Sequence, residues 1–236
     1  AKGELVEDLP TAGTAVLNAD DERVAAMARR TPARVVTYSV SGATADVVAE
    51  RLVLDDELRP SFTLRTPSGS TVVTLAVRGV HQAANALAAA AAGLACGVGL
   101  DDVAAGLADA QLSPWRMDLR RTATGAWVLN DAYNANPASM AAALRSLAAL
   151  PARRRVAVLG FMAELGDDGP GAHADIAALA EELGIDVVAV GTDLYGVAAV
   201  DDPVAALGPL GEGDAVLIKG SRVAGLESLA ASLLDG

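Results

Sequence analysis

Polar side chains gather in one stretch of this alanine-rich and valine-rich chain, the sequence NDAYNANPASM. Asp131 offers a carboxylate, Tyr133 a phenol and Asn134 an amide, which together suit a polar ligand. A purely structural explanation covers only the end of the stretch, because Asn136 can cap a helix whose first position suits Pro137. The other three side chains therefore predict a binding site.

Two lysines stand out because the chain otherwise uses arginine. Lysine and arginine together number 18, and the only lysines are Lys2 in AKGE and Lys219 in KGSR. An amine can lose its proton, be carbamylated or act as a compact point charge, which a guanidinium does poorly. Retention of both lysines fits a chemical role, but chance explains so small a number equally well.

The pattern that must position these residues is an alternation of β-branched runs and alanine-rich helical stretches, which indicates an α/β fold of strands covered by helices. In the first half it predicts strand 14–18, helix 21–30, strand 34–40, antiparallel strands with a turn at 67–69, and helices from His81 and Leu100. In the second half it predicts strand 125–131, helix 139–150, strand 154–160, helix 173–184, strand 186–191, a short helix, strand 214–220 and helix 224–234.

The second half is therefore predicted to be a Rossmann-like, doubly wound parallel sheet. A change of pattern at Pro114 predicts two domains, 1–114 and 115–236. Such sheets bind ligands at the carboxyl ends of their strands. The polar stretch around Asp131, the sequence GFMAELG and the sequence KGSR all lie at such ends.

Composition limits the class of protein. The chain has 236 residues, 52% apolar, and a net charge of −12. This charge disfavours nucleic-acid binding, since no basic cluster exceeds the arginines at 153–155. Cys96 lies in an apolar run and is interpreted as a small core residue in a reducing compartment. No apolar run reaches the roughly 18 residues of a membrane span, so we expect no membrane insertion and a cytoplasmic location.

Several common catalytic patterns are missing from the sequence. It contains neither G-x-x-x-x-G-K-[ST] nor G-x-G-x-x-G, the glycine loops that bind phosphates. His81 and His173 are the only histidines, they fall in different predicted domains, and neither has metal-ligand spacing or a G-x-S-x-G elbow beside it. We interpret His173 as a solvated helix residue.

A set of motifs resembles a known family in order and spacing. AKGEL, AVLNADD, GVHQAANALAAAAAGLACGV, SPWRM, NDAYNANPASMAAAL, VLGFMAELGDDGPGAH and VLIKGSR resemble the Mur ligases of peptidoglycan synthesis. DAYNANP and KGSR favour the members that join D-alanyl-D-alanine to UDP-N-acetylmuramoyl-tripeptide, rather than those that add L-alanine, D-glutamate or a diamino acid.

The resemblance implies an ATP-dependent, ADP-forming amide ligase of three domains. Residues 1–114 would be the latter part of the central ATP-binding domain and 115–236 the C-terminal Rossmann-like domain. The N-terminal domain and the phosphate loop are expected upstream of Ala1. In the family the substrate carboxylate attacks the γ-phosphate to give an acyl phosphate, the dipeptide amine displaces phosphate, and Mg²⁺ neutralises the developing charge. The full enzyme is expected to be monomeric, and this chain alone inactive.

The resemblance also assigns roles to residues. Lys2 matches the lysine that is carbamylated to bind the second Mg²⁺; the alternative is a solvated helix lysine. Asn85 matches the asparagine that contacts adenine, with His81 nearby. The usual HN is HQ here, so a contribution of Gln82 is in doubt.

On the C-terminal side, Arg116 matches the arginine that contacts phosphate and Asp131 the acid that contacts ribose. The resemblance places three further residues around the same pocket: Tyr133, Asn134 and Asn136. Lys219 and Arg222 would bind the anionic end of the dipeptide or the transferring phosphate, with Ser221 beside them; alternatively, Ser221 caps a helix. Many relatives have PGRM where this chain has PWRM, and a polar residue where it has Phe161.

Two alternatives to a ligase remain. A stand-alone binding module could have kept the C-terminal domain and lost catalysis. A nucleotide-dependent oxidoreductase is disfavoured, because the chain lacks the glycine fingerprint and the acid about twenty residues beyond it.

Overall fold

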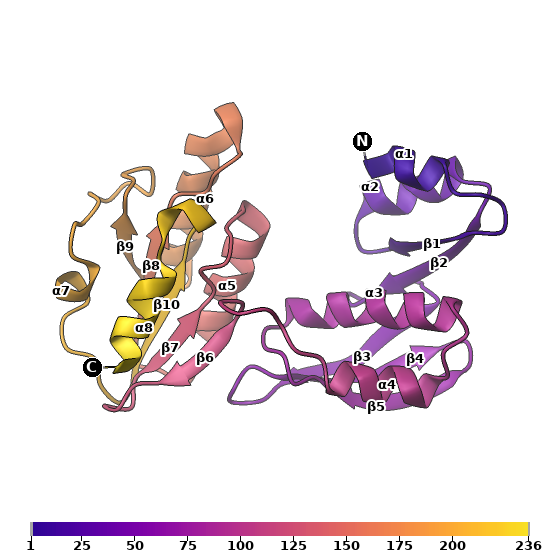
Figure 1. Cartoon of the computed structure of the whole chain (residues 1–236), viewed down its shortest axis with the longest axis horizontal. Helices are drawn as coiled ribbons and strands as arrows, with labels where there is room; N and C mark the ends of the chain where they lie inside the picture. Colours follow the sequence, from indigo (N-terminus) through magenta and orange to yellow (C-terminus); the bar gives the residue numbers. More distant parts are fainter. Residues whose placement is uncertain (1, 236) are drawn as a thin grey trace. The chain divides into compact units, whose positions relative to one another are not determined.

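The computed structural model describes residues 2–235, which form two compact units. The first unit holds the described residues up to Asp55 together with Arg59–Gln111. The second holds Asp56–Leu58 and the residues from Leu112 onward. Figure 1 shows that each unit has its own sheet and helices.

The first unit is built on one five-stranded sheet with the order β1-β2-β3-β4-β5. Strands β1, β2 and β3 pair in parallel, and β3, β4 and β5 pair antiparallel. Its elements are α1 (Lys2–Glu7), β1 (Thr14–Asn18), α2 (Glu22–Ala25), the 3₁₀ helix η1 (Ala26–Arg30), β2 (Arg34–Ser39), β3 (Val47–Leu54), β4 (Pro60–Thr66), β5 (Gly69–Thr74), α3 (His81–Ala95) and α4 (Leu100–Ala108). The predicted helix 21–30 is thus a single α-helical turn followed by a 3₁₀ helix.

The core of the first unit lies between α3 and the sheet. Alanines along one face of α3, such as Ala83 and Ala90, are fully buried and let the helix pack closely on Leu64 and Val73. The interpretation of Cys96 as a core residue is wrong. Cys96 is exposed because it is the C-cap residue that follows the last residue of α3.

The second unit is a five-stranded sheet with the order β6-β7-β10-β8-β9. Strands β7, β10, β8 and β9 are parallel, which confirms the predicted arrangement for the sheet interior. Its elements are β6 (Asp118–Arg121), β7 (Trp127–Asn130), α5 (Pro137–Ala149), β8 (Arg154–Gly160), η2 (Gly166–Asp168), α6 (Gly169–Glu182), β9 (Asp186–Val190), α7 (Pro203–Leu207), β10 (Asp214–Lys219), η3 (Arg222–Ala224) and α8 (Glu227–Asp235).

Strand β6 corrects the prediction of a purely parallel sheet, because it pairs antiparallel with β7. Its sequence DLRR has one buried side chain, Leu119. Such a short, polar strand forms at a sheet edge, where only one side needs a hydrogen-bonded partner.

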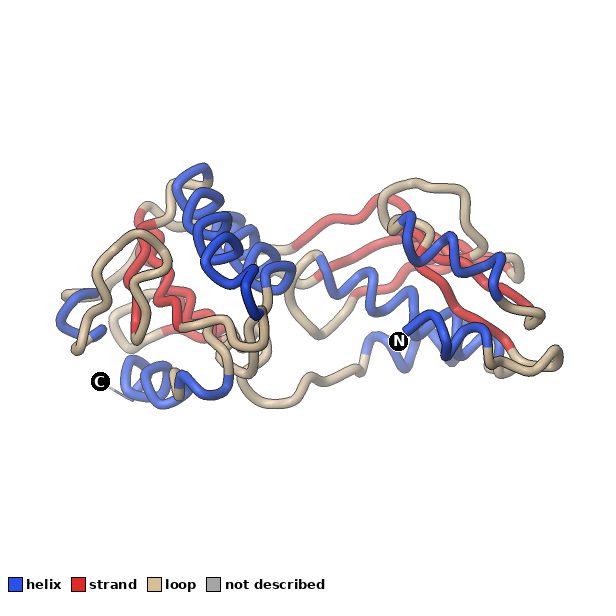
Figure 2. Tube along the Cα trace, turned by 90° about the horizontal axis from the view of Figure 1, so that it is seen from above, coloured by secondary structure: helices blue, strands red, loops and turns tan. Residues whose placement is uncertain are grey.

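Buried strands in the middle of this sheet position the polar loops. In β8 and β10 the side chains of Val156–Leu159 and Ala215–Lys219 are all buried, because helices cover both faces. Figure 2 shows the strands of this unit between α5 and α6 on one side and α8 on the other. Within the described residues, no helix is both long and apolar enough to cross a membrane.

One carboxylate ties the ends of β1 and β2 together. Asp20 accepts hydrogen bonds from the hydroxyls of Ser39 and Ser41, each at 2.6 Å, and from the amide of Val40 at 2.8 Å. Burial opposes its ionisation, but these hydrogen bonds outweigh burial and lower the pKa of Asp20 below its ordinary value of 3.8.

We therefore expect Asp20→Asn to lower the free energy of unfolding by about 1–3 kcal/mol at neutral pH, because an amide cannot accept all of these bonds. Since the folded-state pKa is lowered, the carboxylate stabilises the fold above its ordinary pKa, and this stabilisation is lost as the pH falls through the lowered value. Urea denaturation at pH 7 and near pH 3 measures the difference. The exposed Asp101→Asn is the control. If Asp20→Asn lowers the free energy of unfolding by as much near pH 3 as at pH 7, this explanation is contradicted.

Candidate functional site

The polar stretch after β7 and the KGSR sequence after β10 lie side by side in the second unit. Strands β7 and β10 are neighbours, with Asn130 opposite Ile218 in the register. The amide of Asp131 continues the ladder by donating to the carbonyl of Ile218 at 2.9 Å. Parallel pairing thus places the carboxyl ends of two strands, and the loops that follow them, at one edge of the sheet.

The centre of this edge is a buried ion pair. Lys219 is only 1% exposed, and its Nζ donates to Asp131 Oδ2 at 2.5 Å and to the carbonyl of Asn134 at 2.9 Å. The other carboxylate oxygen, Asp131 Oδ1, accepts from the amide of Met117 at 3.0 Å. One lysine therefore holds both ends of the turn 131–134, and Asp131 connects that turn to the segment before β6.

Burial lowers the pKa of the Lys219 ammonium, and the attraction of Asp131 only partly opposes this shift. Removing the ammonium from water costs more than the single carboxylate returns, as is common for buried pairs. The predicted contact between Lys219 and an anionic dipeptide stays a prediction. In this structure the ammonium is buried and its hydrogen bonds go to the turn 131–134.

Two exposed arginines flank the ion pair, each over an aromatic ring. The Arg116 Cζ lies 3.9 Å from the centroid of the Tyr133 ring, and the Arg222 Cζ lies 4.2 Å from the centroid of the Trp115 ring. Arg116 also donates to Ser113 Oγ at 2.9 Å. Both guanidinium groups keep most of their donors unused, so they can bind an anion at this edge.

The PWRM segment has an uncommon backbone. Trp115 has a φ of 61° and Met117 a φ of 49°, in the left-handed region that glycine adopts most easily. This explains why the glycine of PGRM suits the same position in relatives. Here the segment is held by the bond from Met117 to Asp131 and by the amide of Tyr133, which donates to the Trp115 carbonyl at 3.1 Å.

The helix cap predicted at Asn136 is confirmed. Its Oδ1 accepts from the amide of Ser139 at 2.9 Å, and the Ser139 hydroxyl accepts from the amide of Asn136 at 3.1 Å, which forms a capping box. Pro137 is the first residue of α5. The Asn136 side chain thus has a structural partner, whereas Tyr133 and Asn134 have exposed side chains.

Ser221 does not cap the helix after it, contrary to the alternative considered from sequence. No hydrogen bond from its side chain caps η3. Ser221 is 3% exposed, and its Oγ accepts from the amide of Ala163 at 2.8 Å. The Ser221 amide donates to the carbonyl of Phe161 at 3.0 Å. Ser221 therefore joins the KGSR loop to the loop after β8.

His173 contacts the loop after β8 from the protein interior. Its interpretation as a solvated residue is therefore wrong. It is fully buried. Its Nε2 accepts from the amide of Met162 at 2.9 Å, and its Nδ1 lies 2.7 Å from the carbonyl of Gly169, which requires the tautomer protonated at Nδ1. Its ring stacks on Phe161, with centroids 5.2 Å apart, and packs against Tyr195.

In the first unit, His81 and Asn85 are linked through Gln82. Asn85 Nδ2 donates to Gln82 Oε1 at 2.9 Å, and Gln82 Nε2 lies 3.2 Å from His81 Nε2. The three side chains lie in the first turn and a half of α3. Gln82 therefore contributes to this cluster by orienting its two neighbours.

The predicted metal ligand Lys2 begins α1, but its side chain lies outside the described part of the structure. Among the residues that are described, no group of three or more His, Cys, Asp or Glu side chains is placed to hold a metal ion.

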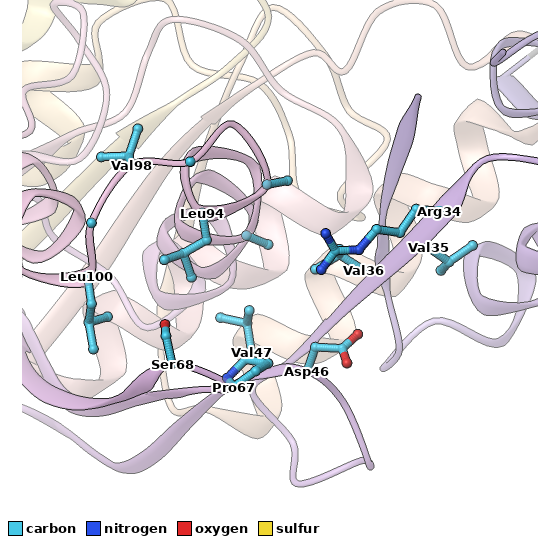
Figure 3. Close-up of a pocket in the computed structure, with 14 residues that line it drawn as sticks. Arg34, Val35, Val36, Asp46, Val47, Pro67, Ser68, Leu94, Val98 and Leu100 are labelled. Atoms are coloured by element: carbon cyan, nitrogen blue, oxygen red, sulfur yellow. The ribbon is translucent and has the colours of Figure 1, made fainter. Parts of the chain in front are cut away.

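A hollow of about 560 Å³ in the first unit has a different character. Figure 3 shows Leu94, Leu100 and Val47 around it, with Arg34 and Asp46 as its charged groups. The residues that line it include none of the predicted site residues. Its mainly apolar lining distinguishes it from the polar clusters described above.

Sequence reasoning missed three parts of the site in the second unit: the amide of Met117, the Trp115 ring under Arg222, and the buried His173. Only Trp115 carried a signal, as the departure from PGRM. A backbone amide leaves no signal in a sequence, and a single histidine does not reveal its burial.

Two family models match the chain: the Mur ligase middle domain over residues 1–93, and the Mur ligase, glutamate ligase domain over residues 115–222. The chain is 41% identical to the UDP-N-acetylmuramoyl-tripeptide–D-alanyl-D-alanine ligase of Mycobacterium tuberculosis (strain CDC 1551 / Oshkosh), covering 99% of this chain and 53% of that protein. For the ligase of the same name from Escherichia coli (strain K12) the identity is 35%, and the coverage is 100% and 55%.

Solved structures give the same picture. A crystal structure of MurF from Acinetobacter baumannii superposes with a TM-score of 0.87 at 31% identity, covering 100% of this chain and 55% of that chain. MurF from Thermotoga maritima in complex with ADP shares the fold, with a TM-score of 0.83 at 20% identity and coverage of 99% and 56%. The chain spans about half the length of the curated relatives it matches.

Lys219→Met should lower the free energy of unfolding by about 3–5 kcal/mol, because it leaves the Asp131 carboxylate without its buried partner. Urea denaturation measures the change. Lys219→Met combined with Asp131→Asn should cost less than the sum of the single changes. The control is Arg120→Met, which removes an exposed pair with Asp118 and should cost less than about 1 kcal/mol. Additive losses at 131 and 219 would refute the coupling.

His173→Leu should lower the free energy of unfolding by about 2–4 kcal/mol, since it leaves the Met162 amide and the Gly169 carbonyl without their partner. The exposed Asp175→Leu on the same helix should change it by about 0.5 kcal/mol or less. Equal effects of the two substitutions would show that the His173 hydrogen bonds do not stabilise the loop.

Proposed function

Because the chain belongs to the Mur ligase family and carries its middle and C-terminal domains, we propose that it is part of an ATP-dependent ligase that joins D-alanyl-D-alanine to UDP-N-acetylmuramoyl-tripeptide. The two relatives above, which bear the name of that activity, support this proposal. Residues 1–114 would be the latter part of the ATP-binding domain and 115–236 the C-terminal domain. The enzyme would act in the cytoplasm, where ATP is available.

The observation that carries the proposal is the edge around the Lys219–Asp131 pair. Lys219 and Met117 fix the Asp131 carboxylate, which keeps unused lone pairs and can accept hydrogen bonds from ribose hydroxyls. Arg116 stands exposed on the Tyr133 ring beside it and can bind phosphate oxygens in a bidentate way. A cation for phosphate and a fixed acceptor for hydroxyls are what a nucleotide requires.

ATP would supply the phosphoryl group that activates the substrate carboxylate. On the second unit, Arg116 would bind and orient its phosphates, Asp131 its ribose, and Tyr133 and Asn134 would bound the pocket. On the first unit, the cluster of His81, Gln82 and Asn85 would bind the adenine edge through amide donors and acceptors.

Arg222 would bind the dipeptide by supplying the charge for its carboxylate. The buried Ser221 would support this contact by holding the loop that carries Arg222. Arg222 is exposed and is oriented by Trp115, with Glu227 3.8 Å away at one end of the guanidinium. Lys219 would keep the nucleotide-binding turn in shape. Lys2 is proposed as the carbamylated magnesium ligand on the family resemblance alone.

The test is ADP release that depends on D-alanyl-D-alanine, with ATP, magnesium and UDP-N-acetylmuramoyl-tripeptide present. The product of the full reading frame that contains this chain should turn over, and Arg116→Ala should lower its kcat/KM by about 10–100-fold, as expected for the loss of a hydrogen-bonded charge. Arg120→Ala, on the neighbouring strand, should leave it unchanged. If the dipeptide never stimulates ADP release, the family supplies the fold but not this chemistry, and a non-catalytic nucleotide-binding or peptide-binding module is the better description.

A further inference from the structure

Three arginines meet at the opposite end of the second sheet from the candidate site. A hollow of about 570 Å³ opens beside the first residues of β7 and β8, and Arg121, Arg153 and Arg155 line it together with Trp127. The candidate site lies at the carboxyl ends of these strands, whereas this hollow lies at their amino ends. The two sites therefore share no residue.

The strand register places the charged groups on one face of the sheet. Arg121 is opposite Trp127, Trp127 is opposite Ala215, and Ala215 is opposite Arg155. Side chains of residues that are direct neighbours across strands project to the same face. The small Ala215 side chain thus stands between the indole and the Arg155 guanidinium, and leaves room between them.

Backbone carbonyls orient the three guanidinium groups. Arg121 Nη1 donates to Gly125 O at 3.2 Å, Arg153 Nη2 to Glu212 O at 3.1 Å, and Arg155 Nη2 to Leu150 O at 2.8 Å. The Arg121 Cζ also lies 3.8 Å from the centroid of the Trp127 ring. These contacts hold the side chains in place but do not neutralise their charge.

Glycine and burial add to this arrangement. A Cβ at Gly213 would come within 2.7 Å of Arg153 Nε, so only glycine lets this guanidinium lie directly on the backbone. The Nε of Arg155 is buried without a hydrogen-bond partner. The carboxyl end of α5 at Leu150 carries a partial negative charge, which explains why Arg155 is favourable here. One helix end does not explain why three arginines converge.

The charge of this hollow contrasts with that of the chain. Within residues 2–235, none of the three arginines forms an ion pair, and Glu212 is the one acidic residue in the lining. The whole chain carries −12. Three like charges that converge repel one another unless an anion lies among them.

We propose that this hollow binds a small phosphate-bearing anion, such as inorganic phosphate, pyrophosphate or a phosphate monoester. Guanidinium groups match phosphate oxygens in bidentate geometry, and each of the three has used only one of its five N–H donors in a bond that the structure shows. Trp127 forms one wall, so an aromatic phosphate ester should bind more tightly than inorganic phosphate. The site is independent of the proposed ligase activity.

Trp127 provides the measurement. In a Trp115→Phe background it is the only tryptophan, and titration with pyrophosphate, phosphate or phenyl phosphate at constant ionic strength should change its fluorescence saturably. Arg153→Gln and Arg155→Gln should each weaken binding about tenfold, the equivalent of about 1.4 kcal/mol. Arg145→Gln, an exposed arginine on α5, and Arg116→Gln at the candidate site should leave it unchanged.

Scanning calorimetry of the same variants without ligand shows whether each one is folded, which separates loss of binding from loss of folding. Arg121→Gln provides a third variant at an exposed position. No saturable change up to about 10 mM ligand would overturn the proposal. So would equal weakening by Arg145→Gln, which would show a general charge effect. Loss of binding in Arg116→Gln but not in the pocket variants would place the anion at the candidate site and overturn it as well.

Discussion

The buried pair between Lys219 and Asp131 is the interaction on which the candidate site depends. It joins the end of β10 to the turn after β7, and through the amide of Met117 it reaches the segment before β6. A buried cation is tolerated only when hydrogen-bonded partners replace its water. That requirement couples the geometry of the turn to folding, so the fold itself holds the side chains that are proposed to bind the nucleotide.

Parallel strands make this arrangement possible. Because β7, β10 and β8 run in one direction, the loops that follow them meet at one edge, and Ser221 and His173 hold the loop after β8 against the loop after β10. The strands themselves are apolar on both faces and provide a rigid base. Arg116, Arg222, Tyr133 and Asn134 are left with exposed side chains at this edge.

The sequence predicts the parts of the fold that repeat at short range. Apolar runs and helical spacing indicate nearly every strand and helix, and the Asn136-Pro137 pair indicates the start of α5. The errors lie where distant contacts decide. Lys219 and Asp131 are 88 positions apart, so the pattern around each shows a polar residue but not its partner. The burial of His173 could not be predicted for the same reason. The exposure of Cys96 could not be predicted because apolar neighbours do not show where a helix ends.

The two ends of the second sheet show how burial decides what a cation does. Lys219 is enclosed, so the protein itself must supply its counter-charge, and Asp131 does so. Arg121 and Arg153 are exposed, and water can solvate them without a carboxylate. Their hydrogen bonds to backbone carbonyls orient the two guanidinium groups but do not neutralise their positive charge. A cation that is oriented yet not neutralised keeps its capacity to bind, and this is the physical basis of the anion site proposed at the amino end of the sheet.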